Sequence, residues 1–166
     1  MVRRLRDAGA TLCGFTHASE FGLGLRGSRA GVAVQESAAD LELVLDHMGE
    51  SRLAAWRAGL CGFKPSYGLV SRLGLIGLIP SMECCGLVSR SVESIRATLE
   101  VIAGQDGLDY SLPDEEAPDL SPQTVDPEKT TIGIVAEALA TLSAQQAEAF
   151  RSALAPLKTL GFSMRE

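Results

Sequence analysis

The sequence predicts an α/β fold, with helices packed on a β-sheet. Apolar residues recur at helical spacing after Ser91, a plausible N-cap, and Gly104 supplies a stop signal. Further along, a β-branched strand at residues 130–135 precedes a helix that a capping box opens at Ser143, and a second short strand follows. Helices that alternate with strands in this way are typical of layered α/β structures.

The first half of the chain contains less regular signals. We expect a short helix over residues 1–8, which Gly9 ends, and a strand over residues 10–14. Residues 37–48 fit both helical spacing and strand alternation, and we favour a helix. The apolar run at residues 73–79 predicts a buried strand.

An acidic, proline-rich connection occupies residues 109–129. Residues 109–128 hold seven of the acidic residues and four of the seven prolines. Such a segment buries little apolar surface, so we expect it to be exposed and irregular. The helix that follows Ser143 presents one apolar face, and Gly161 ends it before a strand at residues 162–164.

Composition and charge exclude several classes of partner. The chain has 166 residues, 46% of them apolar, with a net charge of −6 and a pI near 5.0. This acidic balance argues against direct binding of nucleic acid, which depends on Lys and Arg. The longest apolar run is too short to span a membrane, and the N-terminus lacks the apolar region of a signal peptide. We therefore expect a cytoplasmic or organelle-matrix protein.

The four cysteines have no metal-binding spacing. Cys84 and Cys85 are adjacent, and neither Cys13 nor Cys61 has a second cysteine at C-x-x-C spacing. We expect free thiols in a reducing compartment, with no bound metal and no cofactor.

Several blocks together resemble the amidase-signature family. The most specific is Gly62-Phe63-Lys64-Pro65-Ser66-Tyr67-Gly68, which resembles the family's G-F-K-P-T-Y-G sequence. Gly14 to Phe21 is similar to the G-K-T-x-x-x-E-F block, with Phe15 in place of lysine, and Ala103 to Asp106 is similar to the A-G-x-D turn. Within the family, the likeness is strongest to the A subunits of glutamyl-tRNA(Gln) amidotransferases. The resemblance implies one partial domain over residues 1–166, which forms part of the family's mixed β-sheet with helices packed on it.

The resemblance also implies where catalytic residues should lie. The family uses a serine nucleophile, a second serine in a cis peptide, and a neutral lysine. The lysine belongs upstream of the first helix, and no convincing match for the second serine lies at residues 27–33. Counting back from Phe63 without gaps places Glu50 at the nucleophile position, while Asp46, Gly49 and Arg52 agree with the family pattern. Ser51 becomes the candidate catalytic hydroxyl only if the loop slips by one residue.

Three other constellations are open as alternatives to ordinary packing. His47 with Asp46 and Ser51 suggests a Ser-His-Asp set, although groups so close in sequence rarely reach that geometry. Cys61 or Cys85 with His17 suggests a thiol enzyme, and residues 114–116 suggest a divalent cation site. In each case we favour the structural interpretation: a turn for the first set, core packing for the cysteines, and solvated surface for residues 114–116.

The residues Lys64, Tyr67 and Arg72 resemble structural positions of the family, and we expect them to be scaffold. The sequence therefore favours a catalytically inactive, amidotransferase-A-like protein, whose ancestral reaction is hydrolysis of glutamine to supply ammonia to Glu-tRNA(Gln). Its implied partners are other amidotransferase subunits. The alternatives are a non-catalytic protein that docks on a full-length amidase or on itself through exposed sheet edges and apolar patches, and a part of a longer reading frame.

Overall fold

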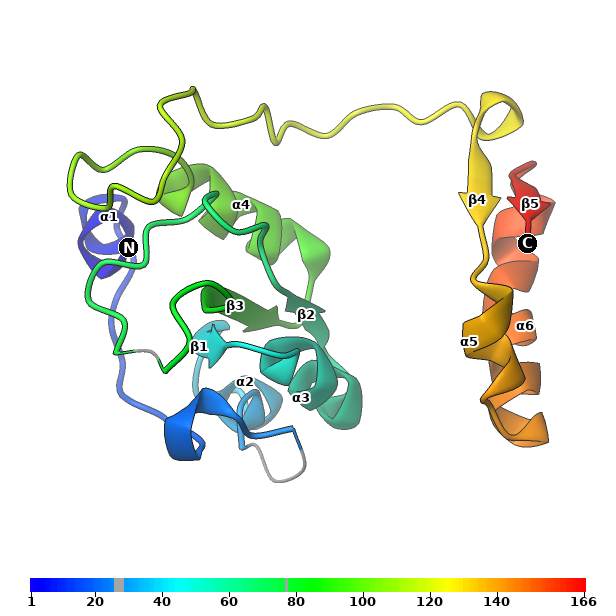
Figure 1. Cartoon of the computed structure of the whole chain (residues 1–166), viewed down its shortest axis with the longest axis horizontal. Coiled ribbons are helices and arrows are strands. Elements are labelled where there is room, and N and C mark those ends of the chain that lie inside the picture. The colour runs from blue at the N-terminus through cyan, green and yellow to red at the C-terminus, as the bar shows by residue number, and fades with distance from the viewer. Residues whose placement is uncertain (26–28, 77) are drawn as a thin grey trace. The chain divides into compact units, whose positions relative to one another are not determined.

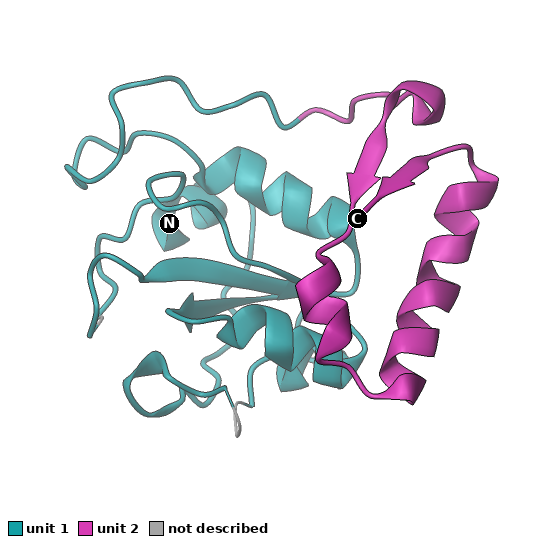
Figure 2. Cartoon of the chain, turned by 45° about the vertical axis from the view of Figure 1, so that its right-hand side comes forward, with its two compact units in different colours: residues 1–120 teal, residues 121–166 magenta. Residues whose placement is uncertain are grey.

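The computed structural model describes residues 1–25, 29–76 and 78–166. Its residues divide into two units, 1–120 and 121–166, which Figure 2 colours separately. The boundary between the units lies in the acidic connection, where residues 109–126 form no helix or strand. No helix in the described part of the chain is long and apolar enough to cross a membrane.

A three-stranded antiparallel sheet lies at the centre of the first unit (Figure 1). Its central strand is β3 (Cys84–Ser89), which pairs with β1 (Leu41–Asp46) on one side and with β2 (Cys61–Phe63) on the other. Leu87 of β3 lies opposite Leu43 and Phe63 in the two registers. All six residues of β3 are buried, because helices cover both faces of this strand.

Helix α4 (Val92–Ile102) covers one face of the sheet. The Ser91 hydroxyl caps it by accepting the N–H of Ser94 at 3.1 Å, as the sequence predicted. The helix contributes three side chains to a core cluster with Val70 and with two residues of β3; the cluster contains Val70, Cys85, Leu87, Ile95, Leu99 and Ile102. Burial of these apolar side chains holds α4 on the sheet.

Helix α1 (Val2–Asp7) packs at the C-terminal end of α4 and confirms the helix predicted over residues 1–8. Its Arg4 guanidinium donates hydrogen bonds to the carbonyls of Ile102, Ala103 and Gly104 at 2.9 to 3.2 Å. Carbonyls at a helix end lack partners within the helix, and a cation there is also favoured by the helix dipole. Arg4 thus links helix α1 to the C-terminal end of α4.

Helices α2 (Val32–Gln35) and α3 (Glu50–Ala58) lie on the opposite face of the sheet (Figure 1). Small and branched residues fill this second cluster, which contains Ala30, Val44, Ala54, Ala55 and Val88. Gly62 of β2 permits a close approach to α3, because a Cβ at this position would lie 2.6 Å from the carbonyl oxygen of Ser51. The side of the sheet that carries α3 is therefore tightly packed.

Three predictions for this unit were wrong. Residues 10–14 form no strand, since residues 10–18 are all exposed and have no neighbouring strand to pair with. The favoured helix at residues 37–48 is instead β1, whose alternation is real, with Glu42, Val44 and Asp46 on the more buried side. Val44 is the apolar residue on that side, and with Leu41, Leu45 and Met48 it imitates helical spacing.

The predicted buried strand at residues 73–79 is also absent from the described residues, which exclude Gly77. The segment turns at Leu75, whose N–H donates to the carbonyl of Arg72 at 2.9 Å, and Ile76 is 95% exposed. Its apolar composition indicated burial. Instead, the Arg72 guanidinium donates a hydrogen bond to the carbonyl of Pro80, and this contact closes the segment into a loop.

The second unit is a strand, helix and strand arrangement, as predicted. Strands β4 (Thr131–Gly133) and β5 (Ser163–Arg165) pair in parallel, and α6 (Ala144–Thr159) connects them together with the unpredicted short helix α5 (Ala136–Ala140). A single 3-10 turn, Pro127–Lys129, precedes β4. The capping box between Ser143 and Gln146 is present at the start of α6. All residues of this unit are described, and none is fully buried.

Candidate functional site

The loop between β1 and α3 carries the residues that the sequence singled out. Asp46 ends β1, and its fully buried carboxylate accepts the N–H groups of Gly49 and Ser51 at 2.6 and 3.0 Å. Gly49, at φ 122°, adopts a backbone conformation that disfavours other residues and turns the chain into α3. Asp46 therefore satisfies the free N–H groups at the start of α3, where negative charge is favoured.

Ser51, the candidate catalytic hydroxyl, lies in the first turn of α3. Its side chain is fully buried and donates its hydroxyl hydrogen to Asp46 Oδ2. Strand β3 approaches it closely, since a Cβ on Gly86 would lie 2.5 Å from Ser51 Oγ. The hydroxyl is therefore directed into the protein and already has an acceptor.

Glu50 lies at the position that the family resemblance gives to the nucleophile, and it is only 3% exposed. One carboxylate oxygen accepts the Ser19 hydroxyl at 2.6 Å, and the other accepts the N–H of Gly24 at 3.2 Å. A Cβ on Gly24 would overlap Ser19 Oγ and approach Glu50, so this contact requires glycine. Glu50 consequently ties residues 19–24 to the loop.

His47 faces a different set of groups. Its Nδ1 lies 3.2 Å from the carbonyl oxygen of Gly22, and its Nε2 lies 3.8 Å from Glu83 Oε2. The arrangement expected of a Ser-His-Asp set has histidine between the other two residues. In the structure Ser51 instead bonds directly to Asp46, while His47 contacts Gly22 and Glu83.

Arg72 joins several segments beside this loop. Its guanidinium lies 3.2 Å from Glu83 Oε1 and 3.9 Å from Asp109 Oδ2, and it stacks 4.7 Å from the centroid of the Tyr67 ring. Burial opposes ionisation of Asp109, but hydrogen bonds from Ser111 and from the Arg72 backbone, with the Arg72 charge, lower the pKa of this carboxyl. These contacts favour the scaffold interpretation of Arg72 and Tyr67.

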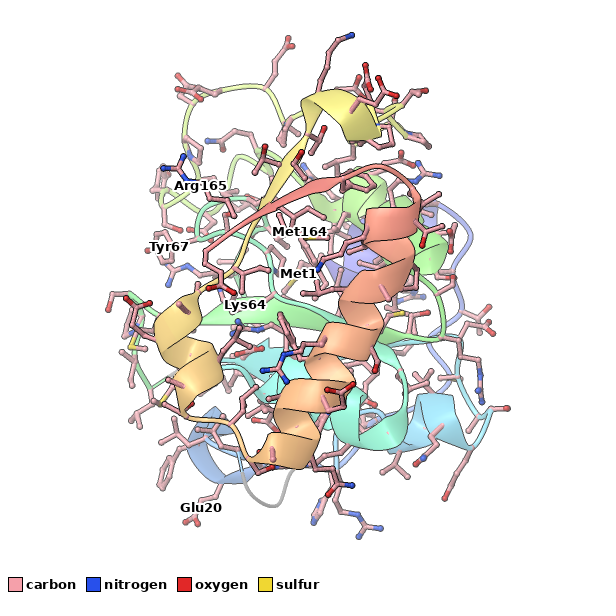
Figure 3. The ribbon with its side chains drawn as sticks, turned by 90° about the vertical axis from the view of Figure 1, so that its right-hand side faces the viewer. Met1, Glu20, Lys64, Tyr67, Met164 and Arg165 are labelled. Carbon is pink, nitrogen blue, oxygen red and sulfur yellow. The ribbon has the colours of Figure 1, made fainter. Side chains whose placement is uncertain are left out.

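Lys64, which Figure 3 labels, also makes structural contacts. Its ammonium group donates to the carbonyl of Pro65 at 2.9 Å and lies 3.6 Å from Cys84 Sγ. The thiol of Cys85 is buried, and this burial raises its pKa to about 12. A thiol that stays protonated at neutral pH is a poor nucleophile, and His17 lies on the exposed surface. These features favour the packing interpretation of Cys85.

The remaining sequence candidates contribute nothing further to the site. Cys61 lies in β2, with its sulfur 3.8 Å from the carbonyl oxygen of Arg90. Residues 114–116 are exposed, and no group of three or more potential ligands lies together among the described residues. The segment at residues 27–33, compared above with the second-serine block, lies partly outside the described residues.

Sequence reasoning missed the groups that hold this loop in place. Nothing in the sequence connected Glu83 with His47 or Arg72. Ser19 and Gly24 were likewise not assigned to Glu50. A polar or glycine residue in a motif block is a weak signal for such contacts, because the partner lies tens of residues away.

Comparison with known proteins identifies the family. The family model described as Amidase matches residues 49–166. The A subunit of glutamyl-tRNA(Gln) amidotransferase from Haloarcula marismortui is 35% identical over the whole chain, and its counterpart from Natronomonas pharaonis is 34% identical. The chain covers 45% of each of these two proteins, so it spans less than half of their length.

A solved structure shows the same fold. The A subunit of glutamyl-tRNA(Gln) amidotransferase from Thermotoga maritima superposes with a TM-score of 0.88 at 24% sequence identity. The superposition covers 98% of this chain and 41% of that protein. Together with the match to the family model, it confirms the resemblance and the α/β fold class predicted from the sequence motifs. The chain belongs to the amidase family.

Proposed function

We propose that this chain is a catalytically inactive relative of the A subunit of glutamyl-tRNA(Gln) amidotransferase. Its ancestral reaction would be hydrolysis of the glutamine amide to supply ammonia to Glu-tRNA(Gln). The observation that carries the proposal is the position of Glu50. Its carboxylate stands where the family resemblance places the attacking serine, and Ser19 and Gly24 hold it there.

A carboxylate at this position opposes amide hydrolysis in two ways. It is a weak nucleophile toward an amide, and its negative charge repels the oxyanion that forms on the substrate carbonyl. In an active amidase, donors aimed at that oxyanion contribute about 3 to 4 kcal/mol each. Two N–H groups of the loop, those of Gly49 and Ser51, are instead directed at Asp46.

The neighbouring hydroxyl offers no clear replacement. A serine nucleophile requires an adjacent base and access to the substrate. Ser51 is fully buried, and Asp46, its acceptor, also receives two backbone N–H groups. The alignment with the Haloarcula marismortui protein extends over 193 residues, whereas this chain has 166, so the relative contains residues that this chain lacks.

An ammonia-release assay tests the proposal. The purified chain is incubated with glutamine and, separately, with a simple aliphatic amide, beside a full-length active amidase as positive control. We expect ammonia release no faster than in buffer. Turnover by the wild type that Ser51→Ala abolishes and that Arg57→Ala, a control on the exposed side of α3, preserves would overturn it.

The partners and the compartment that we propose for this chain rest on its similarity to the amidotransferase A subunits. The related proteins are named as one component of a multi-subunit amidotransferase, so we propose other amidotransferase subunits as partners of this chain. We also propose that residues 1–166 form one partial amidase domain, located in the cytoplasm or an organelle matrix. Co-purification with the other amidotransferase subunits, compared with the chain alone, tests the partner assignment.

A second candidate function is a non-catalytic interaction protein. It is favoured by large apolar side chains on the surface: Phe15 is 94%, Trp56 74% and Ile76 95% exposed. In addition, β1 and β2 each pair only with β3 among the described strands, which leaves two sheet edges open. Light scattering of the chain, alone and mixed with a full-length amidase, measures such association. Monomeric behaviour in both samples counts against this function.

A further inference from the structure

The outer face of helix α3 has the composition of a protein-binding surface. Its exposed residues are Arg52, Leu53, Trp56 and Arg57. Trp56 is the only tryptophan of the chain and is 74% exposed, although tryptophan side chains are highly buried on average. Tryptophan and arginine are enriched among the residues that dominate binding energies at interfaces, so this face is suited to a protein partner.

This face of α3 is rigid and positively charged. Ala54 and Ala55 on the other side of the helix are 3% and 1% exposed and pack on the sheet, so binding orders little new structure. The only acid of the helix, Glu50, is buried. In the part of the chain that the structure describes, neither Arg52 nor Arg57 forms an ion pair with an acid.

An acidic surface of complementary charge lies at residues 114–116, which read Asp-Glu-Glu. All three residues are exposed, and residues 97–128 contain no basic residue that could neutralise them locally. Tyr110, which precedes the run, is 98% exposed and adds an aromatic side chain to this surface. The acidic surface therefore offers both kinds of group that the outer face of α3 can bind, namely carboxylates and an apolar ring.

The acidic run is held in place beside the C-terminal end of α4. The side-chain amide of Gln105 donates to the carbonyls of Leu112 and Pro113 at 2.9 and 2.7 Å. On the other side of the run, Ala117 lies against Gly104, where an added Cβ would be 3.0 Å from the Ala117 Cβ. Contacts on both sides of the run thus fix the backbone that carries the three carboxylates.

The fold keeps these two surfaces apart within one copy of the chain. Helices α3 and α4 pack on opposite faces of the three-stranded sheet (Figure 1). Because the acidic run is anchored to the end of α4, the sheet lies between its carboxylates and Arg52. A second copy can present its acidic run to α3, and opposite charges favour and orient such an encounter.

We propose that copies of this chain associate head to tail, with the outer face of α3 in one copy bound to residues 114–116 of the next. Trp56 and Leu53 form the apolar centre of the contact, and Arg52 pairs with the carboxylates. Two different surfaces meet, so the contact is heterologous and generates a ring or an open chain of copies. The proposal rests on the interaction function considered above and names its surface and its partner.

Fluorescence of the single tryptophan tests whether α3 is covered by another copy. At low salt, we expect the emission of Trp56 to lie at shorter wavelength in concentrated samples and to move to longer wavelength on dilution. Salt at about 1 M, where the Debye length is about 3 Å, should weaken the association. Emission of an exposed tryptophan at every concentration would overturn the proposal. So would short-wavelength emission that dilution leaves unchanged, because α3 would then be covered within one copy.

Mixing of two variants tests the head-to-tail geometry. Trp56→Ala removes the centre of the α3 face, and a triple variant, Asp114→Asn, Glu115→Gln and Glu116→Gln, neutralises the acidic run. We expect each variant alone to associate at least about 30-fold more weakly than the wild type in light scattering. The mixture should form a 1:1 complex, because each variant retains the surface that the other lacks.

Controls separate this contact from other kinds of association. Val92→Ala, which shortens a side chain that is 65% exposed on α4, should associate like the wild type. Undiminished association of the triple variant alone would mean that α3 binds something other than the acidic run, and a mixture that stays monomeric would contradict the head-to-tail contact. Binding to a full-length amidase without association between copies would support the interaction function and overturn this proposal.

Discussion

The carboxylate of Glu50 accepts the hydroxyl hydrogen of Ser19, with 2.6 Å between Oε1 and Oγ. The two residues are 31 positions apart and come from an irregular segment and the first turn of α3. This hydrogen bond connects the segment at residues 19–24 to the start of α3. The Glu50 carboxylate is therefore part of the structure that surrounds the turn between β1 and α3.

The first prediction concerns this contact. Glu50→Ala leaves the Ser19 hydroxyl and the Gly24 N–H without their acceptor in a partly buried place. We expect the free energy of unfolding to fall by about 2 kcal/mol, the usual cost of orphaned buried polar groups. Urea denaturation measures the change. Glu20→Ala removes an exposed acid from the same segment (Figure 3), and should change stability by less than about 0.5 kcal/mol. Equal effects of the two substitutions would contradict a structural role for Glu50.

The second prediction concerns the core between β3 and α4. Leu87 is fully buried at the centre of the sheet and belongs to the cluster that α4 covers. Leu87→Ala should destabilise the fold by about 3 kcal/mol, through lost burial and the cavity that remains. Ile76→Ala deletes a similar side chain that is 95% exposed, so its melting temperature should stay near that of the wild type. A tolerated Leu87→Ala would mean that the core does not depend on this strand.

Local signals predicted the two capped helices, α4 and α6, but missed α2, α3 and α5, none of which has a side-chain cap. The caps at Ser91 and Ser143 act on N–H groups three residues away, so the sequence contains both partners within one turn. Strand β1 depends on β3, which lies more than 30 residues along the chain. Strand β1 does alternate, but Val44 on its second face, together with Leu41, Leu45 and Met48, also matches helical spacing.

The side-chain contacts of the candidate site were also beyond what local sequence patterns could predict. Motif spacing placed Asp46, Gly49 and Glu50 in one motif, with Ser51 directly after Glu50. Spacing carried no information on which groups would contact them. Glu50 meets Ser19, His47 meets Glu83, and each partner lies at least 31 residues away in sequence. Such contacts depend on how distant segments fold together, which no local pattern encodes.

The third prediction concerns the reactivity of the four free thiols. Cys13 is exposed, whereas Cys84 and Cys85 are buried, and burial raises the pKa of Cys85 to about 12. The thiolate is the reactive form, so Cys85 should resist iodoacetamide at neutral pH while Cys13 is alkylated. Mass spectrometry of peptides at increasing times measures both rates. In urea all four thiols should react alike, and early labelling of Cys85 in the folded chain would contradict its buried position.

The last prediction concerns stability in acid. The hydroxyl of Ser71, with smaller contributions from the N–H groups of Asp109 and Leu108, lowers the pKa of Asp106 from 3.8 to about 2. A carboxyl with a lowered pKa stabilises the fold above its unfolded pKa, and this contribution is lost as pH falls through the folded value. Asp106→Asn should therefore cost about 1 kcal/mol near neutral pH, a figure reduced for solvent screening of a half-buried group.

The pH profile separates this effect from a simple packing defect. Between about pH 4 and pH 2 the stability of the wild type should approach that of Asp106→Asn, because protonated Asp106 no longer attracts its donors as a carboxylate. Asp114→Asn, which alters an exposed acid in the connection, should follow the wild type at every pH. Urea denaturation midpoints of the wild type and both variants, measured across this pH range, distinguish the pH-linked effect from a packing defect. A constant difference between wild type and Asp106→Asn would show that its hydrogen bonds stabilise the fold equally in both protonation states.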